Sequence, residues 1–223
     1  LNIKDKKNDN SVPSGIKLCN ALQEMGTTFI KLGQFLATRP DIIGENVSKE
    51  LEKLQDKLPS FDLVVAKNIL KKELDKENFE QITNISEPVA AASIAQVHFA
   101  NINISGKKKD VAIKILRPDI EKIFNEELDA LMLLAYIAQS IVKKTKRLKL
   151  VEVVQLLREI TNVEMDLRFE AAAANELYEN TKNDIGFKVP KIYWNQTSKK
   201  VLCLERVDGI SIREVKNLKA LNI

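Results

Sequence analysis

The sequence predicts an α+β fold in which a helical N-terminal part precedes an antiparallel sheet packed with helices. Three observations support this class. Apolar residues recur at helical spacing through roughly the first 75 residues. The pattern then changes to short alternating strands between residues 82 and 115. Two long helical patterns follow, and after them come two more strands, Val189–Tyr193 and Val201–Leu204. The sheet is therefore predicted to have five strands.

The composition is that of a globular protein. The chain has 223 residues, of which 44% are hydrophobic and 30% charged. A net charge of +4 and only 5% aromatic residues give no indication of nucleic-acid binding. Two cysteines and a single histidine leave no zinc site, and the cysteines are expected to be buried, reduced thiols. The chain starts with Leu1 and stops after an apparent helix start, so we expect a segment of a longer protein.

The N-terminal part is predicted to contain three helices. One starts at Ser14 and contains Gly26 and Gly33. Each glycine lowers intrinsic helicity by ~1 kcal/mol relative to alanine, so a close approach of another segment is one expected reason for them. The others are predicted over residues 47–58 and, with Ser60 or Asp62 as the cap, over residues 63–74.

The second part alternates between strands and long helices. The polar tip Asn103–Asp110 predicts a hairpin turn between the second and third strands. Pro118 ends the third strand, and a helix is predicted over residues 119–142. Within it, the longest apolar run, Leu128–Val142, is interrupted by Asp129 and Gln139 and is too short for a membrane span of ~20 residues. A basic junction at residues 143–149, interpreted as a solvated connection, leads to a second long helix over residues 151–180.

The segment Val111–Lys114, V-A-I-K, is a short alternating run that ends in a lysine. It follows Val89–Val97, a small-residue bend that runs into another strand. This order is typical of the small lobe of a protein kinase, where the strand lysine holds the nucleotide phosphates and a helix glutamate holds the lysine. We expect Glu170 to be that partner. The alternative is an edge-strand lysine that reaches solvent.

Further motifs identify a family. They are Lys31-Leu32-Gly33-Gln34 (K-x-G-Q), Thr38-Arg39-Pro40-Asp41, the run Ala90-Ala91-Ala92-Ser93 in place of a glycine loop, and Glu164-Met165-Asp166 (E-x-D) followed by Glu170. Together these motifs closely resemble the UbiB family of atypical kinase-like proteins, over about Gly15 to Ile212. V-A-I-K alone is a weak signal, but the four further motifs in the family's order make the resemblance specific.

The resemblance implies a kinase-like N-lobe, a five-stranded antiparallel sheet with helices, preceded by a helical extension that carries K-x-G-Q. The implied division is an extension over residues 1–81, the N-lobe over 82–208, and a hinge exit with the start of the C-lobe over 209–223. The rest of the C-lobe, with its catalytic loop and D-F-G, is absent from this segment.

The resemblance also implies a function for the full-length protein. It would be an atypical kinase-like ATPase or phosphotransferase that binds ATP or ADP with Mg²⁺, whose main ligands belong to the C-lobe. It would support ubiquinone biosynthesis at the stage of polyprenylphenol hydroxylation. The implied partners are quinone-biosynthesis enzymes, a lipid or quinone precursor and a membrane surface, on the cytoplasmic side of the bacterial inner membrane or in a mitochondrion or plastid.

The resemblance assigns roles to individual residues. No residue of the segment is assigned to a metal. The predicted catalytic residues are Lys31, Gln34, Lys114, Glu164, Asp166 and Glu170. The predicted nucleotide-binding residues are Val89, Ala90, Ala91, Ala92, Ser93, Ile94, Ala95, Gln96, Val97, Ala112, Lys114, Leu204, Glu205 and Val207.

Helical spacing adds physical expectations. On one continuous helix, Asp166 and Glu170 would be four residues apart and would repel each other unless cations lay nearby. Lys114 and Lys31 are the expected cations. The resemblance implies that Lys31 and Gln34 dock near Glu164 and Asp166. Their shared helix face fits both reaching one site, although ordinary surface polarity is an alternative.

The alanine run and the lone histidine complete the expectations. Alanine disfavours conformations that glycine allows, so the loop should be stiffer, with altered nucleotide selectivity. Ser93 is a candidate for a hydroxyl contact with the ligand, and Leu204 should limit the depth of the pocket. His98 is expected to be a half-exposed structural residue.

Three other functions stay open at this stage. One is a non-catalytic nucleotide sensor or scaffold for quinone-biosynthesis enzymes. Another is a kinase for a lipid or small molecule. A generic protein kinase is disfavoured, because the extension would occupy the region where a peptide substrate should lie.

Overall fold

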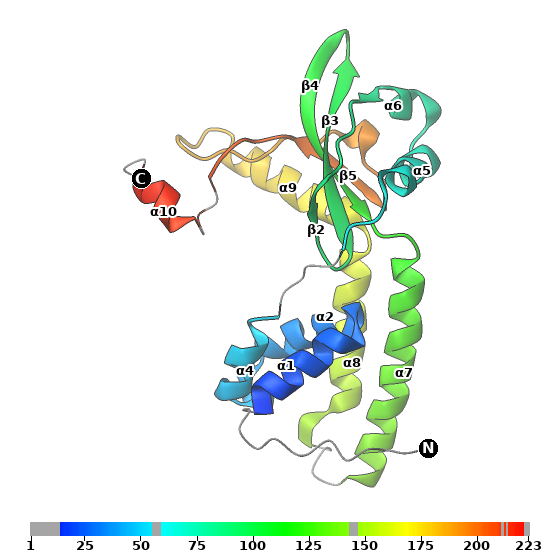
Figure 1. Ribbon diagram of the computed structural model, residues 1–223, viewed down its shortest axis with the longest axis vertical. Helices are drawn as coiled ribbons and strands as arrows, with labels where there is room; N and C mark the ends of the chain where they lie inside the picture. The colour runs from blue at the N-terminus through cyan, green and yellow to red at the C-terminus, as the bar shows by residue number, and fades with distance from the viewer. Residues whose placement is uncertain (1–13, 55–58, 143–146, 211, 213, 221–223) are drawn as a thin grey trace. The chain divides into compact units, whose positions relative to one another are not determined.

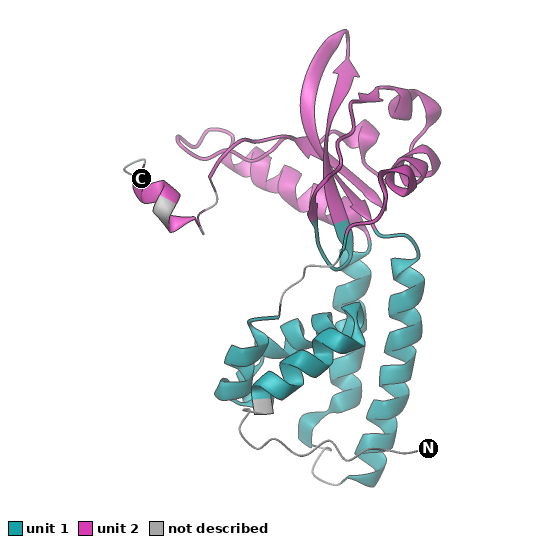
Figure 2. Cartoon of the chain, in the orientation of Figure 1, with its two compact units in different colours: residues 1–59, 91–95, 117–165 teal, residues 60–90, 96–116, 166–223 magenta. Residues whose placement is uncertain are grey.

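The computed structural model describes residues 14–54, 59–142, 147–210, 212 and 214–220. The chain forms two compact units (Figure 2). Unit 1 comprises residues 1–59, 91–95 and 117–165, and unit 2 comprises residues 60–90, 96–116 and 166–223. Both units are therefore built from segments far apart in the sequence. The bounds of these units do not coincide with the predicted domain boundaries at residues 81 and 208. Those boundaries stay a prediction based on motifs.

Unit 1 starts with four short helices. They are α1 (Ser14–Met25), α2 (Thr27–Ala37), α3 (Pro40–Ile43) and α4 (Glu45–Leu51). The prediction of one continuous helix from Ser14 is wrong at Gly26, where φ is 105° and the backbone leaves the helical region. The predicted helix over 47–58 is shorter at its C-terminal end, and residues 55–58 lie outside the described part.

Gly33 lies where two side chains leave no room for a larger residue. A Cβ atom placed there would overlap the Leu54 side chain and come within 2.9 Å of Leu22 Cδ1. Leu22 and Leu54 belong to the buried cluster of this helical region. The predicted close approach at Gly33 is confirmed, whereas at Gly26 the reason for glycine is its backbone conformation.

Unit 1 also contains the helix pair α7 (Ile120–Ile141) and α8 (Leu150–Glu164), which pack side by side (Figure 1). The predicted helix over 119–142 is confirmed, with Asp119 as its N-cap. Of the basic junction at 143–149, residues 143–146 lie outside the described part. None of the described helices is long and apolar enough to cross a bilayer.

The second long helix predicted over residues 151–180 is wrong, because the chain forms two helices there. α8 ends at Glu164, and α9 (Leu167–Thr181) starts after Asp166. Asp166 has an extended backbone, with φ −123° and ψ 96°, and its side chain accepts a hydrogen bond from the Arg168 N–H. A carboxylate that can bond to the backbone in this way favours a helix start over a helix interior.

Unit 2 is built on a five-stranded antiparallel sheet, as predicted. The strands are β1 (Ile82–Thr83), β2 (Pro88–Ala91), β3 (Ala95–Ile104), β4 (Lys107–Leu116) and β5 (Val201–Glu205). Their order is β1-β3-β4-β5, and β2 also pairs with β3. The predicted hairpin turn between β3 and β4 is confirmed, with Ser105 and Gly106 both at positive φ.

The identity of the fifth strand differs from the prediction. Residues 189–193 form no strand; Ile192 alone makes an isolated bridge to Leu204. Pro190 has no N–H to donate, which disfavours a continuous strand there. The strand region predicted over residues 82–115 instead contains four strands, β1 to β4, and β1 pairs Ile82 with Ile102.

One face of the sheet makes the core of unit 2. Its buried residues pack against α5 (Leu63–Glu73), whose predicted extent is confirmed, and against α6 (Lys76–Glu80), which was not predicted. Figure 1 shows α5 and α6 on one side of the sheet and α9 on the other. The core comprises Ala66, Leu70, Leu74, Ile82, Ala100, Ile102, Val111, Ile113, Ile115, Val201 and Cys203. A short 3₁₀ helix (Trp194–Gln196) and α10 (Val215–Ala220) complete unit 2.

His98 is fully buried, which corrects the expectation of a half-exposed position. Its Nδ1 lies 2.8 Å from the Ser86 carbonyl oxygen, so Nδ1 carries the proton and donates. Its Nε2 therefore accepts from the Gln96 amide at 2.9 Å. The same amide group also donates to the Phe61 carbonyl, and the Gln96 carbonyl oxygen accepts from the Phe61 N–H. This network ties the segment before α5 to β3.

The close contact at Gly33 predicts a stability effect. We expect Gly33→Ala to lower the free energy of unfolding by about 1–3 kcal/mol, because overpacking against Leu22 and Leu54 outweighs the ~1 kcal/mol gain in helicity. A urea titration measures the change. Gly209→Ala is the matched control, because a Cβ there meets nothing within 4 Å. A Gly33 variant as stable as this control would contradict the packing argument.

Candidate functional site

Strand β4 directs Lys114 away from the core. Its neighbours Ile113 and Ile115 are fully buried on the core face of the sheet. Successive side chains of a strand point to opposite faces, so Lys114 must point to the face that α9 covers. Pairing with β5 fixes its position, since Lys114 lies opposite Leu202.

Helix α9 supplies the partner of this lysine. Lys114 Nζ donates to Glu170 Oε2 at 2.7 Å, which confirms the predicted ion pair. The Lys114 side chain is 26% exposed and that of Glu170 is 49% exposed. An ion pair this open to water contributes at most about 1 kcal/mol to folding. What the pair provides is a fixed position for an ammonium group that solvent can still reach.

The surface beside Lys114 is apolar. Ala112 lies on the same face of β4 as Lys114 and pairs with Leu204 of β5. Residues directly opposite in an antiparallel pair share a face, so Leu204 and Leu202 lie on this face too. A fixed cation next to small and branched apolar side chains suits a ligand with a flat ring and a phosphate chain.

Two other predicted nucleotide-binding residues, Glu205 and Val207, lie at the end of β5 and just after it. The Glu205 carboxylate accepts from Lys188 Nζ at 2.7 Å, and this contact lowers the pKa of Glu205. The Glu205 N–H donates to the Lys191 carbonyl at 2.8 Å, so this backbone donor is already used. Val207 is exposed in the extended segment that follows β5.

The alanine run forms the tight turn between β2 and β3. The Ala92 N–H donates to the Ala95 carbonyl at 2.8 Å and closes the turn. Arg117, the residue after β4, donates from its guanidinium to the Ala92 carbonyl at 3.1 and 2.9 Å, and from its N–H to the Ile94 carbonyl at 2.9 Å. Sequence reasoning missed Arg117, because no local pattern connects it with the turn.

The turn does not use the left-handed backbone region that favours glycine, while the stiffness expected of alanine stays a prediction. None of residues 89–97 has a positive φ. Val89 and Ala90 are exposed, Ala91, Ala92 and Val97 are partly buried, and Ser93 to Gln96 are buried. Because the Ser93 side chain is fully buried, its position does not support the expected hydroxyl contact with a ligand. The Gln96 side chain is already bonded to Phe61, so only its backbone remains for a ligand.

Within unit 1, Lys31 of α2 meets Glu164 of α8, as predicted. Lys31 Nζ lies 3.0 Å from Glu164 Oε2. Glu164 is the last residue of α8, where the helix dipole disfavours a negative charge, so the lysine offsets an unfavourable position. Gln34, three residues further along α2, is half-buried. The expected approach of Lys31 and Gln34 to Asp166 stays a prediction.

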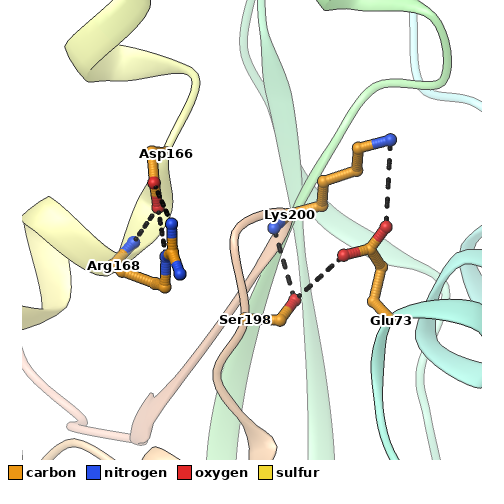
Figure 3. A network of polar contacts seen from close by, with 5 residues as sticks. All are labelled: Glu73, Asp166, Arg168, Ser198 and Lys200. Carbon is orange, nitrogen blue, oxygen red and sulfur yellow. Dashed lines mark hydrogen bonds and ion pairs between the residues drawn. The ribbon is translucent and has the colours of Figure 1, made fainter.

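Asp166 has a partner that sequence reasoning did not consider. Arg168 Nε and a terminal nitrogen of the same guanidinium donate to the two Asp166 carboxylate oxygens at 2.8 and 2.6 Å (Figure 3). These bonds lower the pKa of Asp166, whose side chain is 12% exposed. Asp166 is thus the N-cap of α9, and Arg168 holds its carboxylate. The expectation that Asp166 and Glu170 repel each other within one continuous helix is therefore wrong.

No cluster of metal ligands occurs among the described residues. No group of three or more His, Cys, Asp or Glu side chains in that part of the chain is placed to hold a metal ion. The predicted site residues in that part of the chain thus contain no such group of metal ligands.

Comparisons with known proteins agree with this geometry. Residues 53–223 match the ABC1 atypical kinase-like domain. The chain is similar to a "Probable protein kinase UbiB" of Marinobacter nauticus, with 38% identity over 210 residues, which cover 94% of this chain and 38% of that protein. Proteins with the same name from Pseudomonas fluorescens and Azotobacter vinelandii are each 35% identical, over 92% of this chain and 38% of their own length. The chain spans about 38% of the length of these curated relatives.

The Asp166–Arg168 pair predicts a pH dependence of stability. A carboxylate whose pKa is lowered by folding stabilises the protein above its unfolded pKa, and this contribution is lost as pH falls through the folded pKa. Asn keeps the N-cap bond but not the charge. We expect Asp166→Asn to cost about 1 kcal/mol at pH 7, and the difference from wild type to shrink towards zero as Asp166 becomes protonated.

Urea titrations at neutral and acid pH measure this difference. Asp62→Asn is the control, because Asp62 is the N-cap of α5 but its side chain makes no capping bond. A cost of Asp166→Asn that stays constant between neutral and acid pH would contradict the role of the charge.

Proposed function

This chain belongs to the ABC1 atypical kinase-like family, and from this membership we propose that its full-length protein binds ATP or ADP on the sheet face that carries Lys114. The observation that carries the proposal is the ion pair between Lys114 and Glu170 at 2.7 Å. A strand lysine held by a helix glutamate is the arrangement that kinases use for the α- and β-phosphates.

The roles proposed for the other groups come from the family resemblance. Ala112 and Leu204 would provide the apolar surface for the base. The predicted loop residues 89–97 would contact the phosphates. Mg²⁺ would neutralise charge on the phosphates, with ligands from outside the described residues. Lys31, Gln34, Glu164 and Asp166 would line the reaction site and restrict access to it.

The proposed activity of the full-length protein is ATP hydrolysis or phosphoryl transfer in support of ubiquinone biosynthesis, at the stage of polyprenylphenol hydroxylation. Its substrate side would be a lipid or quinone precursor presented at a membrane surface, on the cytoplasmic side of the bacterial inner membrane, beside other enzymes of quinone biosynthesis. Support comes from the family and from relatives named UbiB. A non-catalytic nucleotide sensor would bind ATP without turnover, so a turnover assay on the full-length protein separates the two functions.

Removing the Lys114 ammonium tests nucleotide binding. We expect Lys114→Met in the full-length protein to weaken ATP binding by about 10- to 100-fold, the effect of losing a hydrogen bond between charged groups. The fold should survive, because Glu170 is half-exposed and remains hydrated. Calorimetry gives the affinity, and a thermal melt without nucleotide gives the stability.

Lys200→Met is the matched control for Lys114→Met. Lys200 lies 3.8 Å from Glu73 (Figure 3), and neither residue is among the predicted site residues. Its substitution should leave ATP affinity unchanged. A well-folded Lys114→Met protein with wild-type ATP affinity would remove Lys114 from the phosphate site and with it the main support for the proposal.

The ion pair of the extension predicts a separate effect. We expect Lys31→Ala to reduce quinone content several-fold in a deletion strain, because Glu164 loses its cation, while stability falls by at most about 1 kcal/mol. Lys53→Ala is the control, since it breaks the Lys53–Glu50 pair in the same helical region. Normal quinone content with well-folded Lys31→Ala would show that Lys31 has no functional role.

A further inference from the structure

The C-terminal half of α7 is unusual for a helix on a protein surface. Residues 130–142 include no charged side chain, whereas residues 121–129 include five. Large apolar side chains in the uncharged half are nevertheless exposed. The exposed fractions are 61% for Leu133, 60% for Leu134, 45% for Ile137 and 75% for Ile141.

These side chains form a continuous stripe along the helix. Leu133, Leu134, Ile137 and Ile141 follow the spacing that puts residues on one face of a helix. The opposite, buried side of α7 includes Ile120, Phe124, Leu128 and Ala135. The helix therefore has two apolar faces, of which one is packed within unit 1 and the other is not covered by any described residue. We call the second face the α7 stripe.

A basic pocket lies at the same end of the helix pair. Because α7 and α8 pack side by side and are joined by a short connection, α8 starts where the α7 stripe ends (Figure 1). The pocket there has a volume of about 520 Å³. Its polar lining consists of Arg39, Arg147 and Lys149 with Asp41 and Glu152, and the rest is apolar: Ile42, Leu148, Val153 and Leu156.

The charges of this basic pocket leave an excess of positive charge. Arg39 pairs with Asp41 at 2.7 Å, and Lys149 pairs with Glu152 at 2.8 Å. Arg147 adds a third cation and is exposed. Three cations against two carboxylates leave the pocket suited to one anionic group, while its apolar lining suits the hydrocarbon next to that group.

We propose that the α7 stripe and the basic pocket together dock unit 1 on an anionic lipid surface. The stripe would enter the interface, and the pocket would take a lipid phosphate. Amphipathic helices that bind in this way lie in the plane of the interface. The alternative occupant of the stripe is a second copy of this chain, which the dye measurement below distinguishes from a lipid surface. The inference rests on the membrane surface named in the proposed function and identifies the part of the chain that meets it.

A dye on the stripe tests the inference directly in the full-length protein, whatever other membrane contacts that protein makes. Ile137→Cys is labelled with an environment-sensitive dye. Cys19 and Cys203 are buried, and burial raises the pKa of the Cys203 thiol to about 12, so both native thiols react slowly. Ile123→Cys is the matched control, because Ile123 is 42% exposed on the charged half of the same helix.

With vesicles of phosphatidylcholine and phosphatidylglycerol, we expect the dye at position 137 to shift to the blue and to be quenched by brominated lipid, and the dye at position 123 to do neither. Phosphatidylcholine vesicles alone should give a much smaller shift, since the pocket then has no net anion to bind. Equal behaviour at positions 137 and 123 would overturn the proposal. A blue shift that depends on protein concentration without vesicles would overturn it in favour of a second copy of the chain.

Two further variants separate the parts of the surface. Leu134→Ser with Ile141→Ser should lower the dye signal at position 137 at a given vesicle concentration by about tenfold or more, because two large side chains no longer enter the interface. Arg147→Gln should reduce its salt sensitivity and its preference for phosphatidylglycerol. An Arg147→Gln protein with unchanged lipid preference would remove the pocket from the proposal. All measurements are made without nucleotide, so the loss of ATP binding and the loss of lipid binding are seen separately.

Discussion

The site depends on one constraint, which is that β4 can bury only one of its two faces in the core of unit 2. Ile113 and Ile115 take the core face and leave Lys114 on the other. Helix α9 covers that face, and its Glu170 lies close enough to form an ion pair with Lys114. Pairing with β5 adds Leu204 and Leu202 beside it. The same alternation that makes the core thus places a charged group where it is held and still accessible.

Much of this arrangement follows from the sequence. Alternation and turn residues predict the β3–β4 hairpin, since Ser105 and Gly106 favour the positive φ values that a tight hairpin needs. The two ion pairs, Lys114 with Glu170 and Lys31 with Glu164, were predicted from the motifs. In each pair two residues of opposite charge occupy motif positions far apart in the sequence. Local patterns and a family resemblance therefore fix the outline of the site.

Other features could not be found in this way, because they depend on hydrogen bonds between segments or on single backbone conformations. Apolar periodicity continues across Asp166, so it hides the break that the side chain of Asp166 creates. Nothing near Arg117 reveals that its guanidinium will bond to Ala92. Gln96 and His98 look like ordinary residues of an alternating strand, although their partners make them fully buried. In each case the deciding contact joins residues that no periodic pattern connects.

The pairing of β4 with β5 has a consequence for how the chain reaches its fold. Residues 117–200 lie between these two strands, and they include α7, α8 and α9. During synthesis from the N-terminus, β4 must therefore wait with one edge unpaired until residue 205 has left the ribosome. An unpaired edge invites association with other strands, and contacts between residues so far apart form slowly. The helices of unit 1 rely on more local contacts, so the nascent chain would carry a partly folded helical region before its sheet is complete.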